Sequence, residues 1–252
     1  MRPLILLITA TALAQPSRPT FDVLSVKHVG DMQSNMIREG NMTRSTMRPF
    51  QYTPGSFSAK NTLRNILQNA YQLASYQIQG PEWMQTEVYE ISAKMPDGTS
   101  KETARLMLQS GLEDRLGMKV RLEEKELSIF RMVVIPGTNK LEKVETPTGG
   151  SGVRFGMNML ESAAMPMAGL ASSLTQAAGK PVIDETGREG FYKVSLHWEV
   201  EPIPADHTGP IRIGTDPGIL GAIKDLGLKL EQAKKSMPFL TVEKVSKEPT
   251  EN

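Results

Sequence analysis

The chain has 252 residues, of which 39% are hydrophobic and 23% charged, and its 29 basic and 28 acidic residues give a formal net charge of +1. A near-neutral charge argues against a nucleic-acid partner. The absence of cysteine excludes disulfides, thiolate metal sites, cysteine nucleophiles and a lipid attached to an N-terminal cysteine.

Residues 1–14 have the pattern of a secretory signal peptide. Arg2 provides a positive start, residues 4–13 form a mostly apolar run, and Ala12-Leu13-Ala14 fits the small-x-small rule for cleavage. The run is shorter than the roughly 20 residues that span a bilayer, and no later segment approaches that length. We therefore expect an exported protein, periplasmic or extracellular, with no stable membrane anchor and no lipid anchor. A buried N-terminal strand is the alternative interpretation.

The first elements expected after the signal peptide are extended. Alternating side chains predict a strand at residues 21–27. Residues 30–48 are polar, contain several methionines and lack a clean period, so we interpret them as a loop. Pro54-Gly55 predicts the turn of a hairpin within residues 50–59.

Two amphipathic helices are expected next. The first has its apolar residues on one face at 3.6-residue spacing and begins after an N-cap at Asn61. The second begins at a capping box in residues 99–102 and ends at Gly117. The strands predicted around these helices are 76–79, 88–93, 118–123 and 129–135.

Residues 136–152 are rich in glycine and proline and are the best candidate for a linker. After them we expect a helix whose first turn contains Pro166 and which ends at Gly179. Residues 192–200 alternate between apolar and polar side chains, which predicts a half-buried strand. The remaining expected elements are strands at 155–160, 182–183, 228–231 and 239–245, a proline-rich loop at 202–218, and a short helix from Asp216 to Gly227.

The order of these elements repeats. Leu116-Gly117-Met118-Lys119 resembles Leu226-Gly227-Leu228-Lys229, and a strand follows each at a similar distance. We predict an α+β fold of two similar halves, each strand–helix–strand–strand–helix–strand–strand, with helices packed on antiparallel or mixed sheets. The alternative is a shared helix–glycine–strand pattern without duplication. The predicted organisation is a signal peptide at 1–14, an N-terminal strand and methionine-containing loop at 15–56, a first half at 57–135, a linker at 136–152 and a second half at 153–252.

A set of short motifs between about residue 21 and residue 248 carries a resemblance to a known family. The motifs include Phe21-Asp22-Val23 with Ser25-Val26-Lys27, Asn61-Thr62-Leu63-Arg64-Asn65-Ile66-Leu67, Tyr76-Gln77-Ile78-Gln79-Gly80-Pro81-Glu82-Trp83, Lys180-Pro181-Val182-Ile183-Asp184 and Leu226-Gly227-Leu228-Lys229-Leu230-Glu231. Together they resemble the soil-associated family of exported bacterial proteins of unknown function.

This resemblance implies export but no activity. In some relatives the similar domain is joined to a membrane-bound sensor-type zinc peptidase, which suggests an extracytoplasmic sensing or binding role. The sequence departs from the family at Lys193, where an acidic residue usually follows the tyrosine, and at Gly221, which interrupts the last helix. A more distant likeness is to the short N-terminal domains of secretins and TonB-dependent receptors, which bind partner proteins through surfaces and strand edges.

No residue pattern predicts a catalytic site, a metal site or a cofactor. His28, His197 and His207 lack the spacing of metal ligands. Ser151 does not complete a Gly-x-Ser-x-Gly motif. Asp184 and the next residue could form a carboxylate pair, but they precede a Thr-Gly turn, where aspartate usually binds its own backbone.

Four side chains remain as candidates for a binding surface. Tyr71 and Trp83 belong to the best-matched motifs, and Trp83 either covers the core or marks a surface; the other two are Asp184 and Tyr192. The sequence favours a non-catalytic extracytoplasmic binding or protein-interaction module, with an envelope protein or a small ligand as partner. The alternatives are an envelope assembly or secretion component that uses exposed strand edges, and a hydrolase that uses carboxylates, which requires a pocket with two convergent acidic groups.

Overall fold

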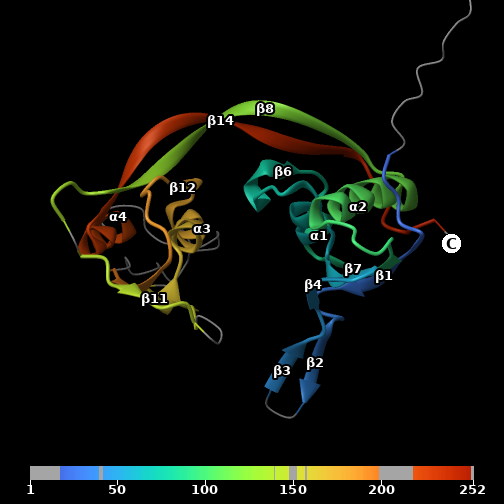
Figure 1. Cartoon of the computed structure of the whole chain (residues 1–252), viewed down its shortest axis with the longest axis horizontal. Coiled ribbons are helices and arrows are strands. Elements are labelled where there is room, and N and C mark those ends of the chain that lie inside the picture. Colours follow the sequence, from blue (N-terminus) through green and yellow to red (C-terminus); the bar gives the residue numbers. More distant parts are fainter. Residues whose placement is uncertain are drawn as a thin grey trace, which may run out of the picture. The chain divides into compact units, whose positions relative to one another are not determined.

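The computed structural model describes residues 18–39, 42–138, 140–147, 152–156, 158–198 and 218–250. The chain forms two compact units, unit 1 (Met1–Glu123 with Pro238–Asn252) and unit 2 (Glu124–Met237), whose elements are shown in Figure 1. The predicted signal peptide, Ser151, His207 and most of the predicted loop at 202–218 lie outside the described residues. No helix in the described ranges has both the length and the apolar character that a membrane crossing requires.

A four-stranded antiparallel sheet belongs to unit 1. Its strands lie in the order β1 (Val23–Asp31), β7 (Glu87–Lys94), β5 (Ser56–Thr62) and β4 (Arg48–Thr53). The predicted hairpin is confirmed as β4 and β5, because the chain turns at Pro54-Gly55, where Gly55 has a φ of 71°. β1 and β4 are the two edges of this sheet.

The segment interpreted as a loop contains a second, smaller sheet. β2 (Met36–Glu39) and β3 (Met42–Ser45) form an antiparallel pair, drawn in Figure 1 as a ribbon of its own. The loop interpretation is therefore wrong for these residues. Met36 and its neighbour Ile37, which point to opposite faces of β2, are both exposed, so neither face of β2 is buried at these two positions. A strand without a buried face carries no polar–apolar alternation by which to recognise it.

Both predicted helices of unit 1 are present, α1 (Leu63–Tyr71) and α2 (Lys101–Leu116). Each begins one residue later than expected. Thr62, rather than Asn61, caps α1, because its hydroxyl accepts from the backbone N–H of Asn65 at 3.3 Å. Ser100 caps α2 in the same way. Gly117 ends α2 in the left-handed conformation, with a φ of 56°, as predicted.

The core of unit 1 consists of apolar residues from both helices and from the sheet, which include Phe57, Leu63, Ile66, Leu67, Ile91, Leu108 and Leu112. Between the helices the chain forms two short 3-10 helices, η1 (Ser75–Gln77) and η2 (Glu82–Gln85), and the strand β6 (Ile78–Gln79). β6 pairs in parallel with the C-terminal part of β14 (Leu228–Lys244). This pairing places Leu240 and Val242 in the core of unit 1.

Unit 2 has its own sheet and core. The sheet is antiparallel, in the order β10 (Arg154–Phe155), β11 (Met159–Met165), β13 (Phe191–His197) and β9 (Lys143–Val144). The predicted alternation in β13 is confirmed, since Tyr192, Val194 and Leu196 are buried and the residues between them are exposed. The other elements of unit 2 are α3 (Met167–Ala178), β12 (Val182–Asp184), α4 (Gly218–Ala222) and the 3-10 helix η3 (Ile223–Leu226).

Two long strands replace the two pairs of shorter strands that the sequence predicts. β8 (Lys119–Val134) and β14 are each continuous. Within unit 2, Glu126 pairs with Lys234 at 2.9 Å and Glu124 accepts from Ser236 at 2.9 Å. Polar side chains that lie between the predicted shorter strands therefore contact the neighbouring strand. β12 joins β8 in parallel, so this sheet is mixed.

The fold is α+β with antiparallel and mixed sheets, as predicted. Leu116-Gly117 and Leu226-Gly227 both join the end of a helix to a long strand through a left-handed glycine, but a repeat of whole halves is not confirmed. The boundaries between the units fall within β8 and β14, whereas the sequence placed them in a linker at 136–152. That segment belongs to unit 2 and contains β9, because pairing with β13 overrides its glycine and proline content.

Candidate functional site

The predicted binding residue Tyr71 lies at the end of α1, half-buried against the core of unit 1. Its hydroxyl is buried, and no group in the described part of the chain forms a hydrogen bond with it. Burial, assisted by the negative charge of Glu113 and opposed by Arg18, raises the pKa of Tyr71 to about 12. The phenol is therefore neutral near physiological pH, and it offers an apolar ring and one unused polar atom.

Trp83 lies in η2 and packs against the same core, partly buried. The ammonium group of Lys247 is 5.7 Å from the centre of its ring, a cation–π distance. This contact connects the Trp83 motif to the C-terminal residues of the chain.

The two candidates in unit 2 have structural surroundings. A carboxylate oxygen of Asp184 accepts from the backbone N–H of Thr186 at 3.0 Å and from its hydroxyl at 2.8 Å, the contacts of a turn-forming aspartate. Tyr192 is 5% exposed in the core, and its hydroxyl donates to the carbonyl of Glu189. A surface role for Tyr192 is not supported, because it lies on the inward face of β13.

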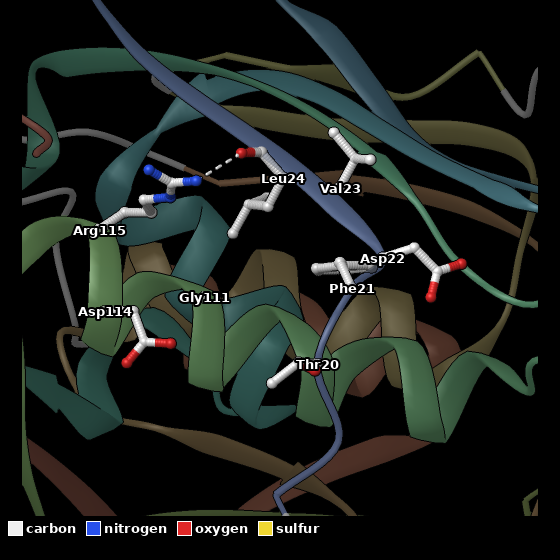
Figure 2. A pocket seen from close by; sticks show the side chains of 8 residues that line it. All are labelled: Thr20, Phe21, Asp22, Val23, Leu24, Gly111, Asp114 and Arg115. Atoms are coloured by element: carbon white, nitrogen blue, oxygen red, sulfur yellow. Dashed lines mark hydrogen bonds between the residues drawn. The ribbon is translucent and has the colours of Figure 1, made fainter. Parts of the chain in front are cut away.

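A pocket with a volume of about 390 Å³ lies between the start of β1 and α2. Figure 2 shows the residues that line it: Thr20, Phe21, Asp22, Val23, Leu24, Gly111, Asp114 and Arg115. A guanidinium N–H of Arg115 donates to the carbonyl of Leu24 at 3.1 Å. The carboxylates of Asp22 and Asp114 point in different directions and do not converge (Figure 2). This pocket therefore lacks the carboxylate pair that the hydrolase hypothesis requires.

A cluster of titratable groups surrounds His28 in unit 1. Nε2 of His28 lies 2.7 Å from Glu87, and Nδ1 lies 2.9 Å from Glu248. Glu87 is also paired with Lys247 at 2.5 Å, and the hydroxyl of Tyr89 donates to the backbone carbonyl of Lys247 at 2.8 Å. The residues come from β1, β7 and the C-terminal segment, so the cluster forms only in the folded chain.

The charges in this cluster stabilise one another. Burial alone would lower the pKa of His28, but the hydrogen bonds and negative charges of Glu87 and Glu248 raise it above the ordinary value of 6.5. Hydrogen bonds from Lys247 and His28 lower the pKa of Glu87. Burial and the two nearby carboxylates raise the pKa of Tyr89, which stays neutral. Within the described ranges, no group of three or more His, Asp and Glu side chains is placed to hold a metal ion.

The second prominent feature of unit 1 is the arm, which we define as β2, β3 and the turn at residues 32–35. Met32, Met36 and Ile37 are 38%, 47% and 50% exposed. The base of the arm is fixed by Asn35, which is buried and donates to the carbonyls of Val29 and Asp31 at 2.9 and 2.8 Å. The apolar residues are thus presented on an anchored support.

Comparison with known families gives a single clear result. A family of proteins of unknown function, DUF3738, matches residues 64–245. The chain belongs to this family. The matched residues run from α1 to just beyond β14, so the family includes elements of both units. Its description names no activity. No curated protein and no solved structure was found to be similar to the chain.

Sequence reasoning missed the arm and the His28 cluster. His28 is 59 residues from Glu87 and 220 residues from Glu248, so no local spacing indicates their contact. The available signal for the arm was its methionine content combined with a polar background, a pattern that we interpreted as a loop. Of the predicted residues, Tyr71 and Trp83 pack against one core, and Asp184 and Tyr192 belong to the other unit.

Proposed function

We propose that the protein is an exported, non-catalytic module that binds a partner protein through the arm. Export rests on the signal-peptide pattern of residues 1–14. Binding rests on one observation: three of the seven exposed large hydrophobic residues in the described chain, Met32, Met36 and Ile37, fall within six consecutive positions. Clustered exposed apolar residues mark interaction sites more often than scattered ones do.

The geometry of the arm favours a protein partner. Met36 and Ile37 are neighbours on β2, so their side chains point to opposite faces of the strand pair. A two-stranded sheet also has unpaired backbone groups along both outer edges, and such a hairpin is marginally stable alone in water. An apolar groove that receives the arm would cover both faces of the strand pair and would supply hydrogen-bond partners to the backbone groups along one edge.

The charge of the arm limits the kind of groove. Arg44 on β3 is exposed, as is Arg48 on the adjoining strand β4, and a guanidinium nitrogen of Arg48 lies 3.7 Å from a carboxylate oxygen of Glu90. Asp31 is engaged locally by hydrogen bonds from Ser34. The partner surface we propose is an apolar groove bordered by carboxylates, so binding should weaken as salt concentration rises.

The test is site-specific photo-crosslinking in the native host, with the crosslinking amino acid at position 37 or at position 106. Ile37 and Leu106 are 50% and 49% exposed, so position 106 is a control of matched exposure in α2. We expect a discrete product only from position 37, and we expect Arg44→Glu to reduce it. Identical products from both positions, or none from position 37, would refute the proposal.

A second measurement uses purified protein. Unmodified purified protein, added in excess, should compete for the partner and reduce the crosslinked product from position 37. The variant with Met36→Ser and Ile37→Ser should not compete, whereas the Leu106→Ser variant should compete as well as the unmodified chain. All three side chains are exposed, so the substitutions should change stability by less than about 0.5 kcal/mol. A double variant that still competes fully would show that the arm is not the binding surface.

A further inference from the structure

The C-terminal residues 246–250, which we call the strap, are attached to unit 1 at both ends. The backbone N–H of Ser246 donates to the carbonyl of Leu116 at 2.9 Å. The backbone N–H of Thr250 donates to the carbonyl of Arg115 at 2.8 Å. Both acceptors lie in the last turn of α2, so these bonds fix the strap to the helix and do not depend on pH.

Between these attachments, the strap contacts side chains of β1 and β7. Lys247 pairs with Glu87 at 2.5 Å, and its carbonyl accepts from the Tyr89 hydroxyl at 2.8 Å. Glu248 contacts His28 at 2.9 Å. The Lys247 ammonium also lies 5.7 Å from the Trp83 ring centre. The strap therefore lies against Trp83 and satisfies the hydroxyl of a buried tyrosine.

The chemistry of the imidazole makes this arrangement dependent on a proton. Both ring nitrogens of His28 face carboxylate oxygens, of Glu87 on one side and Glu248 on the other. Only the protonated ring has an N–H on each nitrogen, and a neutral ring presents a lone pair to one of the two acceptors. One contact must therefore be lost when the ring loses its proton.

The structure also indicates which contact breaks. The side chain of Glu87 is 13% exposed and has Lys247 as a second partner, whereas that of Glu248 is 76% exposed. Glu248 can move into water at little cost, but Glu87 cannot. We propose that the strap is a proton-dependent cover, closed over Trp83 and Tyr89 when His28 is charged and loosened at Glu248 when His28 is neutral.

Among the described residues, the titratable and aromatic groups that contact His28 or its partners come from β7 and the strap. β7 contributes Glu87 and Tyr89, whose ring centre lies 5.2 Å from that of His28. The strap contributes Lys247 and Glu248. Burial keeps the phenol of Tyr89 neutral by raising its pKa, and hydrogen bonds keep Glu87 ionised by lowering its pKa. The charge that changes near neutral pH is therefore that of His28.

The test measures hydrogen exchange of the strap amides in the full chain at two pH values, one below and one above the ordinary histidine pKa of about 6.5. Protection is normalised to the intrinsic exchange rates. We expect the protection of residues 247 and 248 to fall roughly two- to fivefold at the higher pH, the effect of one exposed charge pair. A glutamine side chain can donate to a neutral imidazole, so Glu248→Gln should remove this pH dependence.

His197 supplies the matched control, because it also pairs with a glutamate, Glu161, at 3.3 Å, but in unit 2. His197→Gln should leave the strap profile unchanged. The His28 pKa, read from the imidazole NMR signals, should lie above the ordinary value in the unmodified chain and should fall in the Glu248→Gln variant. Equal protection at both pH values, or the same profile in the Glu248→Gln variant, would overturn the proposal.

Discussion

The two Leu-Gly junctions have similar sequences but different surroundings, and alanine at each glycine separates two physical effects. Gly117 has a φ of +56°, and a Cβ placed there has no atom within 4 Å. Gly227 has a φ of +71°, and its Cβ would lie 2.7 Å from Oγ1 of Thr138 and 3.2 Å from its Cβ. That hydroxyl donates to the carbonyls of Ile135 and Gly227, so turning it away would lose hydrogen bonds.

The expected losses of stability follow from these surroundings. Alanine in the left-handed conformation costs about 1–2 kcal/mol at either position. Overpacking adds about 1–3 kcal/mol, and it applies only to Gly227→Ala. We therefore expect Gly117→Ala to lower the free energy of unfolding of unit 1 by about 1–2 kcal/mol, and Gly227→Ala to lower that of unit 2 by about 2–5 kcal/mol.

The chain contains two tryptophans, one in each unit, so urea unfolding can be followed separately. Trp83→Phe leaves Trp198 as the reporter of unit 2, and Trp198→Phe leaves Trp83 as the reporter of unit 1. With a urea m-value of about 1–3 kcal/mol/M, the loss at Gly227 should shift the midpoint by about 1 M or more. Equal losses of stability at the two glycines, or a larger loss at Gly117, would refute the conclusion that contact with Thr138 makes Gly227→Ala the more destabilising substitution.

Three further predictions concern the cluster, the arm and the core. Because folding raises the pKa of His28, the contribution of His28 to stability is fully present below about pH 6.5 and is lost as the pH rises through the folded-state pKa. Because folding lowers the pKa of Glu87, the contribution of Glu87 to stability is lost as the pH falls below about 4.5. His28→Gln should therefore lower the unfolding free energy of unit 1 mainly between these limits; a loss that persists unchanged at pH 9 would contradict this. Asn35→Ala removes three hydrogen bonds at the base of the arm, to Val29, Asp31 and Thr46, and should make the arm more sensitive to limited proteolysis, with a cost of about 1–3 kcal/mol; unchanged cleavage would count against Asn35 as its anchor. Tyr192→Phe should cost about 0.5–1.5 kcal/mol, measured by urea unfolding of unit 2, because it loses the hydrogen bond to the carbonyl of Glu189; a change above about 3 kcal/mol would mean that the hydroxyl has another role.

The sequence alone was sufficient where one face of an element is buried. The apolar positions of α1 and α2, the alternation in β13 and the glycine at the end of α2 each predicted the observed element. In each of these elements the spacing of the apolar residues indicates which side chains are removed from water on folding. Removing apolar side chains from water is the main source of the free-energy difference between the two faces of a helix or strand.

Tertiary structure decided the rest. The polar centres of β8 and β14 look like breaks in sequence, but Glu126 and Lys234 remain in extended backbone because each strand supplies the partner of the other. Met36 and Ile37 of the arm are exposed on opposite faces of β2, so no alternation between polar and apolar side chains marks that strand in the sequence. The His28 cluster joins residues up to 220 positions apart, and a contact over that distance is fixed by the packing of the chain and not by any local preference. The sequence determined the class of fold and contains the pattern on which the proposal of export rests. The arm proposed for binding and the strap proposed as a proton-dependent cover exist only once the chain has folded.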